Sequence, residues 1–438
     1  MTLATPITVI RGRFLDIQKT VAQANQIADQ VRYIEDGVLI TEQGKIRWFG
    51  TWNDAQAHLP INIEIQHYPE QLIIPGMIDT HIHFPQTEMV GAYGEQLLSW
   101  LNTYTFPTEI QFKDKAYASE IAKFFVNELL KNGTTTALVF CTVHPESVNA
   151  LFEAAEQHQM RLIAGKVMMD RHAPEALCDS ADSSYDDSKA LIEKWHGQGR
   201  ALYAITPRFA PTSTPEQLER AGQLKAEHPD VYVHTHLSEN KDEIAWVKDL
   251  FPAQKGYLDV YHHYGLTGQR SVFAHCVHLE DAEWQCMHET DCAIAFCPTS
   301  NLFLGSGLFP LNKTWQQQVK VGLGTDVGAG TSFSLLQTVN EAYKVQQLQG
   351  DKLSAYESLY HATLGGAKAL DLDDKLGNFN VGKEADFVVL NLKPTALQQL
   401  RQSRAKSLED SLFALFTMGD DRNVEATYIY GQKAYSQN

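Results

Sequence analysis

Two histidines separated by one residue, His81 and His83, are the first side chains in this sequence that could do chemistry. They end the run Met77–His83, which predicts a buried β-strand. Side chains two positions apart on a strand point to the same side of it, so the two imidazoles converge. Imidazole is a good ligand for zinc and related divalent ions. The pair therefore indicates a metal site, although the motif alone is also compatible with two surface histidines.

The elements that would position this pair are short β-branched runs that alternate with amphipathic helices. Such alternation is typical of βα units that build a parallel sheet. From residue 76 onward the predicted strands are Met77–His83, Thr134–Phe140, Arg161–Met169, Leu202–Phe209, Val231–Leu237, Ser271–His275, Cys292–Cys297 and Val319–Thr325. Eight strands close a (β/α)8 TIM-like barrel, an α/β fold whose chemistry lies at the C-terminal ends of the strands. His81 and His83 occupy such an end.

The two ends of the chain have a different pattern. Residues 1–74 contain a predicted hairpin around Gly44, and residues 373–438 contain another around Gly431. Neither end alone is a convincing domain. Because chain termini often lie close together, we expect both ends to form one small discontinuous β-sandwich domain beside a catalytic barrel of residues 75–372.

Three further predicted strands supply candidate ligands at the same rim. The fifth strand leads to His236, the sixth ends at His275, and the eighth runs into Asp326. Four histidines and one carboxylate at the ends of four barrel strands are improbable by chance, so we interpret them as a metal centre. Zinc and iron both accept this ligand set, and the identity of the ion stays open.

Glu239 follows His236 by three residues, which places it at the rim beside the expected metal. A rim glutamate is usually only solvated, but next to an activated water it is the natural proton carrier. His234 has the same strand parity as His236 and lies deeper, so we expect a packed side chain or an indirect contact with the site. His278 is expected in a loop, with an indirect contact as the alternative.

Gln86, Arg208 and Phe209 are candidates for substrate contacts. Gln86 follows the histidine pair by three residues, and Arg208 and Phe209 end the fourth predicted strand. A planar guanidinium, an amide and an aromatic face suit a flat, polar heterocycle. Each residue alone is more simply explained as a loop glutamine, a surface arginine or a core phenylalanine, and only their shared location favours a binding site.

The composition limits the classes of molecule that the protein could bind and the compartment in which it could work. Lysine and arginine total 36 against 53 acidic residues, a formal net charge of −17, which disfavours binding to nucleic acid polymers or anionic membranes. Residues 1–11 lack the pattern of a secretory signal, and no apolar run is long enough to span a membrane. The six cysteines form no disulfide-like framework, so reduced thiols in a cytoplasmic protein are expected.

The segments around these residues resemble the guanine deaminase family of the amidohydrolase superfamily. The matching segments are Pro75–His83, Trp100–Glu109, Thr206–Thr212, His234–Asn240, Phe296–Asn301, Val321–Asp326 and Gly382–Phe387. The first and last are superfamily features, and the segments Trp100–Glu109, Thr206–Thr212, His234–Asn240 and Phe296–Asn301 are more specific to the family. The resemblance extends over nearly the whole chain.

The resemblance implies hydrolysis of guanine, a small purine base, to xanthine and ammonia, usually with one zinc ion in each subunit of a homodimer. The metal positions it implies are His81, His83, His236, His275 and Asp326. It assigns proton transfer to Glu239 and Asp326. The substrate positions it implies are Gln86, Arg208, Phe209, His236 and Glu239. In related one-metal deaminases the histidine of strand six contacts the water more than the ion, so direct ligation by His275 stays open.

The predicted strand four, Leu202–Phe209, contains no lysine that could be carboxylated to bridge two ions, and Lys166 lies on strand three. One metal is therefore expected, with zinc favoured and Fe²⁺ as the alternative. Related hydrolases of 8-oxoguanine, adenine-type or triazine-like rings remain alternatives, as does a non-catalytic scaffold. The smaller cytidine deaminase fold is disfavoured, because His144-Pro145-Glu146 is followed by no P-C-x-x-C motif.

Overall fold

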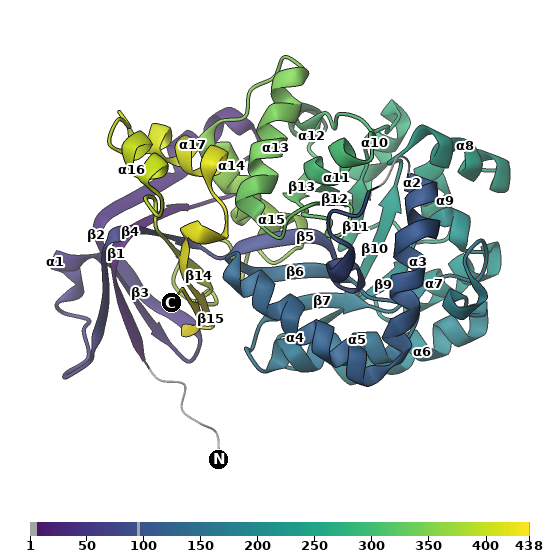
Figure 1. Cartoon of the computed structure of the whole chain (residues 1–438), viewed down its shortest axis with the longest axis horizontal. Helices are drawn as coiled ribbons and strands as arrows, with labels where there is room; N and C mark the ends of the chain where they lie inside the picture. Colours follow the sequence, from purple (N-terminus) through teal and green to yellow (C-terminus); the bar gives the residue numbers. More distant parts are fainter. Residues whose placement is uncertain (1–6, 94–96, 438) are drawn as a thin grey trace.

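The computed structural model describes residues 7–93 and 97–437, which form two separate sheets (Figure 1). The larger sheet has the order β13-β12-β11-β10-β9-β7-β6-β5, with β8 paired to β9, and every pair in it is parallel. Its strands are β5 (Met77–His83), β6 (Thr134–Phe140), β7 (Arg161–Gly165), β8 (Val167–Met168), β9 (Leu202–Pro207), β10 (Tyr232–Leu237), β11 (Ser271–His275), β12 (Ala293–Phe296) and β13 (Lys320–Leu323). The eight predicted strands and the TIM-like α/β fold are confirmed, with the third strand divided at Lys166.

The first and last strands of this sheet, β5 and β13, lie next to each other without a regular ladder. Two backbone hydrogen bonds link β5 to the segment after β13. The Asp326 amide donates to the His81 carbonyl over 2.9 Å, and the His83 amide donates to the Val327 carbonyl over 2.9 Å. The barrel is therefore joined at the residues predicted to bind metal.

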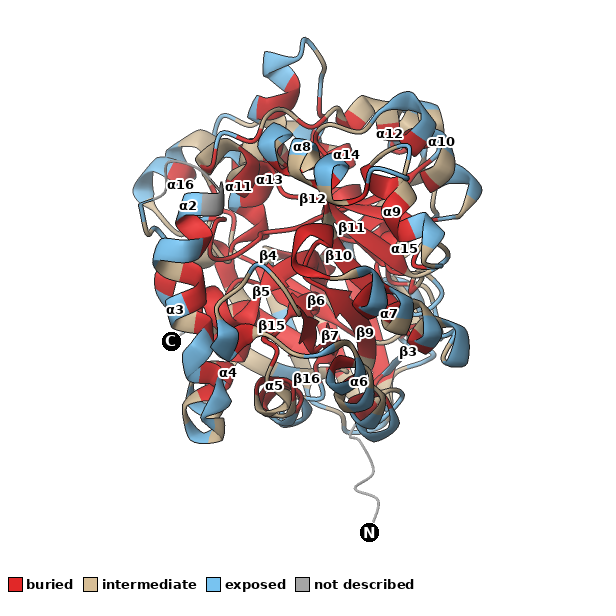
Figure 2. Ribbon diagram, turned by 90° about the vertical axis from the view of Figure 1, so that its right-hand side faces the viewer, coloured by how far each residue is buried: buried red, intermediate tan, exposed pale blue. Residues whose placement is uncertain are grey.

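Helices surround the barrel, and the buried strands lie at its centre (Figure 2). The helices of the chain are α1 (Trp52–Ala55), α2 (Leu97–Trp100), α3 (Phe106–Glu109), α4 (Lys115–Lys131), α5 (Pro145–Glu156), α6 (Ala181–Trp195), α7 (Pro215–Glu227), α8 (Lys241–Leu250), α9 (Tyr257–His263), α10 (Asp281–Glu289), α11 (Pro298–Phe303), α12 (Leu311–Gln317), α13 (Leu335–Leu348), α14 (Ala355–Ala362), α15 (Leu364–Ala369), α16 (Ala396–Gln402) and α17 (Leu408–Met418). In α4, Asp114 caps the first turn by accepting from the Ala116 amide, and Ala118, Ala122 and Phe125 are buried against the sheet. Among the described residues, no helix is long and apolar enough to cross a bilayer.

The interior of the barrel is filled by side chains rather than open. One buried cluster takes residues from β5, β6, β7, β9, β10, β11 and β12, and Ala367 and Leu370 at α15 pack into the same cluster. A packed interior holds the strand ends rigidly, so the side chains that follow them have fixed positions.

Strands from both termini form the second sheet, in the order β16-β15-β14-β4-β1-β2-β3. They are β1 (Thr8–Ile17), β2 (Val31–Glu42), β3 (Lys45–Thr51), β4 (Ile65–Pro75), β14 (Phe387–Leu390), β15 (Val424–Ile429) and β16 (Gln432–Ser436). All neighbours are antiparallel except β1 and β4. Both ends of the chain therefore contribute to one sheet, as expected, but this is a single seven-stranded sheet rather than two packed sheets, and apolar clusters containing Phe14 and Val38 lie against it.

A buried charge network joins the two sheets. Arg200 donates to Asp386 Oδ2 and to Glu384 Oε2, each over 2.5 Å, and Arg161 Nε donates to Glu384 Oε2 over 2.9 Å. The arginines precede or begin barrel strands, and both carboxylates precede β14 of the terminal sheet. Because a buried charge is tolerated only when paired, this network fixes the terminal domain to the barrel.

Candidate active site

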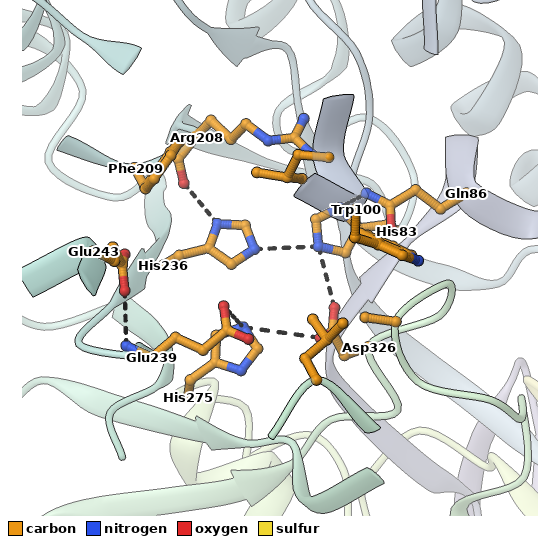
Figure 3. A pocket seen from close by; sticks show the side chains of 13 residues that line it. His83, Gln86, Trp100, Arg208, Phe209, His236, Glu239, Glu243, His275 and Asp326 are labelled. Atoms are coloured by element: carbon orange, nitrogen blue, oxygen red, sulfur yellow. Dashed lines mark hydrogen bonds and ion pairs between the residues drawn. The ribbon is translucent and has the colours of Figure 1, made fainter. Parts of the chain in front are cut away.

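The predicted metal ligands meet at the C-terminal rim of the barrel. Figure 3 shows four of them, His83, His236, His275 and Asp326. The Nε2 atoms of His81 and His83 lie 3.2 Å apart, and His236 Nε2 lies 3.2 Å from His83 Nε2. The two β5 side chains therefore converge as the strand parity predicted, and β10 brings His236 beside them.

Asp326 adds an oxygen to these three nitrogens. Its Oδ1 lies 3.1 Å from His81 Nε2 and 3.2 Å from His83 Nε2. Ligand atoms bound to one zinc ion at about 2.0–2.1 Å lie about 3.3 Å apart in a tetrahedral site. The spacing and chemistry of the four donor atoms thus fit one divalent ion.

His275 stands slightly apart from this group. Its Nε2 is 3.8 Å from Asp326 Oδ2 and 3.5 Å from Glu239 Oε2, so it faces two carboxylates. His275 and Asp326 both have left-handed backbones, with φ of 70° and 50°. Such strained conformations turn the chain sharply after the strand and are common at functional sites.

The outer nitrogens of the histidine ligands are also occupied. His236 Nδ1 donates to the Arg208 carbonyl over 2.6 Å, and His275 Nδ1 donates to Asn301 Oδ1 over 2.9 Å. His81 Nδ1 lies 2.8 Å from Nε2 of the fully buried His234. These partners fix the ring orientations and leave the Nε2 atoms directed at the centre.

Burial keeps the imidazoles neutral. It lowers the pKa of His83 to about 3, and it also lowers the pKa values of His81 and His236. Burial alone would raise the pKa of Asp326, but its contacts with His81 and His83 hold that pKa well below its usual range. Neutral imidazoles and an ionised carboxylate are the protonation states that a metal ion requires.

Glu239 lies opposite this ligand group, buried between two partners. Ser306 Oγ donates to its Oε1 over 3.1 Å, and His275 faces its Oε2. Burial, followed by the negative charge of Asp326, raises the pKa of Glu239 to about 8. The carboxyl group can therefore carry a proton near neutral pH.

One pocket contains the predicted substrate residues together with the metal centre (Figure 3). It is lined by His83, Gln86, Trp100, Leu101, Arg208, Phe209, His236, Glu239, Glu243, His275, Leu304, Asp326 and Ala329. Every predicted site residue lies in this pocket or, in the case of His81, directly behind it.

Sequence reasoning missed several residues of this region. Trp100 and the buried Glu109, which pairs with Arg208, belong to a family-like segment that carried the only available signal. Glu243 accepts the Glu239 amide over 3.0 Å, and its place three residues after the helix cap Asn240 is a capping-box pattern that could have predicted it.

His234, His278 and Lys166 do not line the pocket. The indirect contact considered for His234 is present, through His81. His278 Nε2 donates to the carbonyl of Ser306, the residue that holds Glu239. Lys166 is buried away from the pocket and pairs with Asp179.

Comparison with known proteins agrees with this geometry. The model of the amidohydrolase family matches residues 72–434. The chain is 62% identical to the guanine deaminase of Escherichia coli (strain K12), over 99% of this chain and 98% of that protein. It superposes on the solved structure of an E. coli guanine deaminase with a TM-score of 0.96 and 60% identity, covering 99% of this chain and 100% of the other. A guanine deaminase from C. acetobutylicum, solved with guanine bound in its active site, gives a TM-score of 0.87 at 30% identity, covering 98% and 100% of the two chains.

Proposed function

Since this chain belongs to the amidohydrolase family and, within it, to the guanine deaminases, we infer that it hydrolyses guanine to xanthine and ammonia. One observation carries this conclusion. A four-donor metal centre and the predicted substrate residues share a single buried pocket, in a chain that is 62% identical to a guanine deaminase.

We propose that His81, His83, His236 and Asp326 hold one zinc ion, with Fe²⁺ as the alternative. The 3.1–3.2 Å separations of their donor atoms support a single ion, and β9 offers no lysine to bridge a second one. His275, whose Nε2 lies 3.8 Å from Asp326 Oδ2, would either add a further ligand or contact a water bound to the ion. A divalent ion in this site supplies a water molecule that is acidic enough to react near neutral pH.

The protein's own carboxyl groups then move the protons. Asp326, whose Oδ1 lies 3.1–3.2 Å from the Nε2 atoms of His81 and His83, would accept the proton that the attacking water releases. Protonated Glu239 donates to the ring nitrogen beside C2, the carbon that water attacks. The 2-amino group leaves as ammonia after it takes up a further proton, which balances guanine plus water against xanthine plus ammonia.

The opposite part of the pocket holds the purine. The Arg208 guanidinium can donate two hydrogen bonds to O6 and N7 of guanine. Gln86 adds an amide beside His83, and the Phe209 ring supplies an apolar face. His236 and Glu239 contact the reacting end of the ring.

The test is xanthine formation by the purified protein from guanine, with and without a chelator. Activity that is lost on chelation and restored by zinc is expected. A panel with 8-oxoguanine, adenine and a triazine checks the substrate. Ammonia release from one of those rings but none from guanine would overturn the conclusion, and a protein that never retains metal would support the scaffold alternative.

A homodimer and a cytoplasmic location are part of the same proposal. The homodimer is what the resemblance to guanine deaminases implies, and the cytoplasmic location is supported by six cysteines that are all free thiols. Light scattering of the purified protein measures the first, and fractionation of the producing cells measures the second.

A further inference from the structure

Glu109, at the end of α3, is a fully buried carboxylate to which the chemistry above gives no task. Its Oε2 lies 2.8 Å from Arg208 Nη1, and its Oε1 lies 3.0 Å from the same nitrogen. Arg208 is itself only 3% exposed. The two side chains form a buried ion pair, and a buried charge is tolerated only when it is paired.

The way in which Glu109 holds Arg208 leaves one edge of the guanidinium free. Both carboxylate oxygens contact Nη1, and in the part of the chain that the structure describes Nε and Nη2 have no hydrogen-bond partner. Nε and Nη2 form the edge that makes paired, parallel hydrogen bonds to planar acceptors. Arg208 lines the pocket, with the Phe106 ring 5.5 Å from its guanidinium carbon.

Glu109 also sets the orientation of Gln86. Gln86 Nε2 donates to Glu109 Oε1 over 3.2 Å, and the Gly328 amide donates to Gln86 Oε1 over 3.2 Å. A carboxylate can only accept and a backbone N–H can only donate, so these two neighbours fix which end of the amide faces which way. Gln86 Nε2 also lies 3.1 Å from His83 Nδ1. One carboxylate thus contacts both the guanidinium and the amide group that line this part of the pocket.

We propose that Glu109 is a positioning residue that determines specificity for purines with an oxygen at C6. It holds Arg208 so that its free edge meets O6 and N7, and it locks Gln86 beside it. Figure 3 shows Arg208 and Gln86 across the pocket from Glu239 and His275, so a purine gripped at O6 and N7 presents its C2 end to the reacting groups. This inference rests on the proposed guanine deamination.

A purine without the C6 oxygen would leave a desolvated Arg208 N–H without an acceptor. A site built to hydrogen-bond a ligand group rejects analogues that lack it. If Glu109 loses its charge, the guanidinium and the amide are free to turn, and this rejection should weaken.

The test compares the zinc-loaded wild type with Glu109→Gln, which keeps the shape and removes the charge. Calorimetry measures the affinity for hypoxanthine, which has O6 and N7 but no 2-amino group, and for purine, which lacks both O6 and the amino group. The ratio of the affinity for hypoxanthine to the affinity for purine should fall by about 10- to 100-fold, which is the usual contribution of a charge-assisted hydrogen bond. For guanine turnover, we expect KM to rise more than kcat falls.

Glu357→Gln is the matched control, because Glu357 is a buried carboxylate outside the pocket that accepts from Trp315 Nε1 over 2.9 Å. It should leave the hypoxanthine preference unchanged. Glu109→Asp, which keeps the charge, should retain most of the preference and provides a second variant if Glu109→Gln does not fold. Metal content and melting temperature are followed for each protein.

An unchanged preference in Glu109→Gln, or equal losses for both ligands, would overturn the inference and leave Glu109 a purely structural role. This result differs from failure of the proposed function. In that case the wild type itself would release no ammonia from guanine.

Discussion

Replacing His234 with alanine should weaken zinc binding without removing any ligand. His234 lies on β10, fully buried, with its Nε2 2.8 Å from His81 Nδ1. When His81 offers the lone pair of Nε2 to an ion, its proton sits on Nδ1 and His234 accepts it. The substitution leaves that N–H buried without an acceptor.

The expected loss of zinc affinity can be estimated in two independent ways. A buried donor left unsatisfied costs about 1–3 kcal/mol. Loss of the partner that orients a metal-ligating histidine lowers metal affinity by about 10- to 100-fold, or about 1.4–2.7 kcal/mol. The two ranges agree, so zinc affinity should fall by about 10- to 100-fold.

The assay is competition for zinc against a chromophoric chelator, using folded protein. His234→Gln keeps an acceptor at this position and should recover most of the affinity. His361→Ala is the matched control, because His361 is equally buried but lies outside the pocket. Zinc affinity of His234→Ala within about twofold of the wild type, or an equal loss in His361→Ala, would refute the reasoning.

Three further predictions concern proton transfer, domain attachment and pH. Glu239→Gln should keep its metal, measured by atomic absorption, and lose about 10²- to 10⁴-fold in kcat, because the amide cannot carry the proton; a normal rate would remove Glu239 from the mechanism. Arg200→Met should lower the free energy of unfolding by about 3–5 kcal/mol in urea titrations, because it leaves the buried charge of Asp386 without its cationic partner and leaves Glu384 with Arg161 alone. Burial raises the pKa of Glu243 to about 7, so the folded state binds this proton more tightly than the unfolded state, and the stability it contributes is lost as pH rises from about 4.5 to 7. Glu243→Gln should therefore gain about 1–3 kcal/mol relative to the wild type between pH 5 and pH 8, and a constant difference would contradict this assignment.

The parts of the site that the sequence predicted correctly depend on local rules. The convergence of His81 and His83 follows from strand parity, and the position of His236 follows from the barrel rule that strand ends carry the chemistry. Both rules can be applied to the local sequence alone, before it is known which segments are neighbours in space.

The parts that could not be predicted depend on contacts between distant segments. Glu109 and Arg208 are 99 residues apart, and nothing in either segment alone indicates that they pair. The predicted third strand breaks at Lys166, whose buried ammonium pairs with Asp179 on a later loop. In the terminal domain, β4 contains Pro69 and two exposed polar residues, His67 and Glu70, so its pairing with β1 has only a weak local signal.

The contact between β5 and the segment after β13 determines how the barrel opens locally. Its two backbone hydrogen bonds involve His81, His83 and Asp326 themselves, so an ion held by these three residues also clasps the first strand of the ring to the last. Removing the ion should loosen this closure first. The amide hydrogens of His83 and Asp326 should then exchange with deuterium faster in chelated protein than in zinc-loaded protein, while those of β9, which carries no proposed ligand, keep their protection. The barrel closes at the proposed metal site, so one ion would both take part in the reaction and stabilise the contact between the first and last strands.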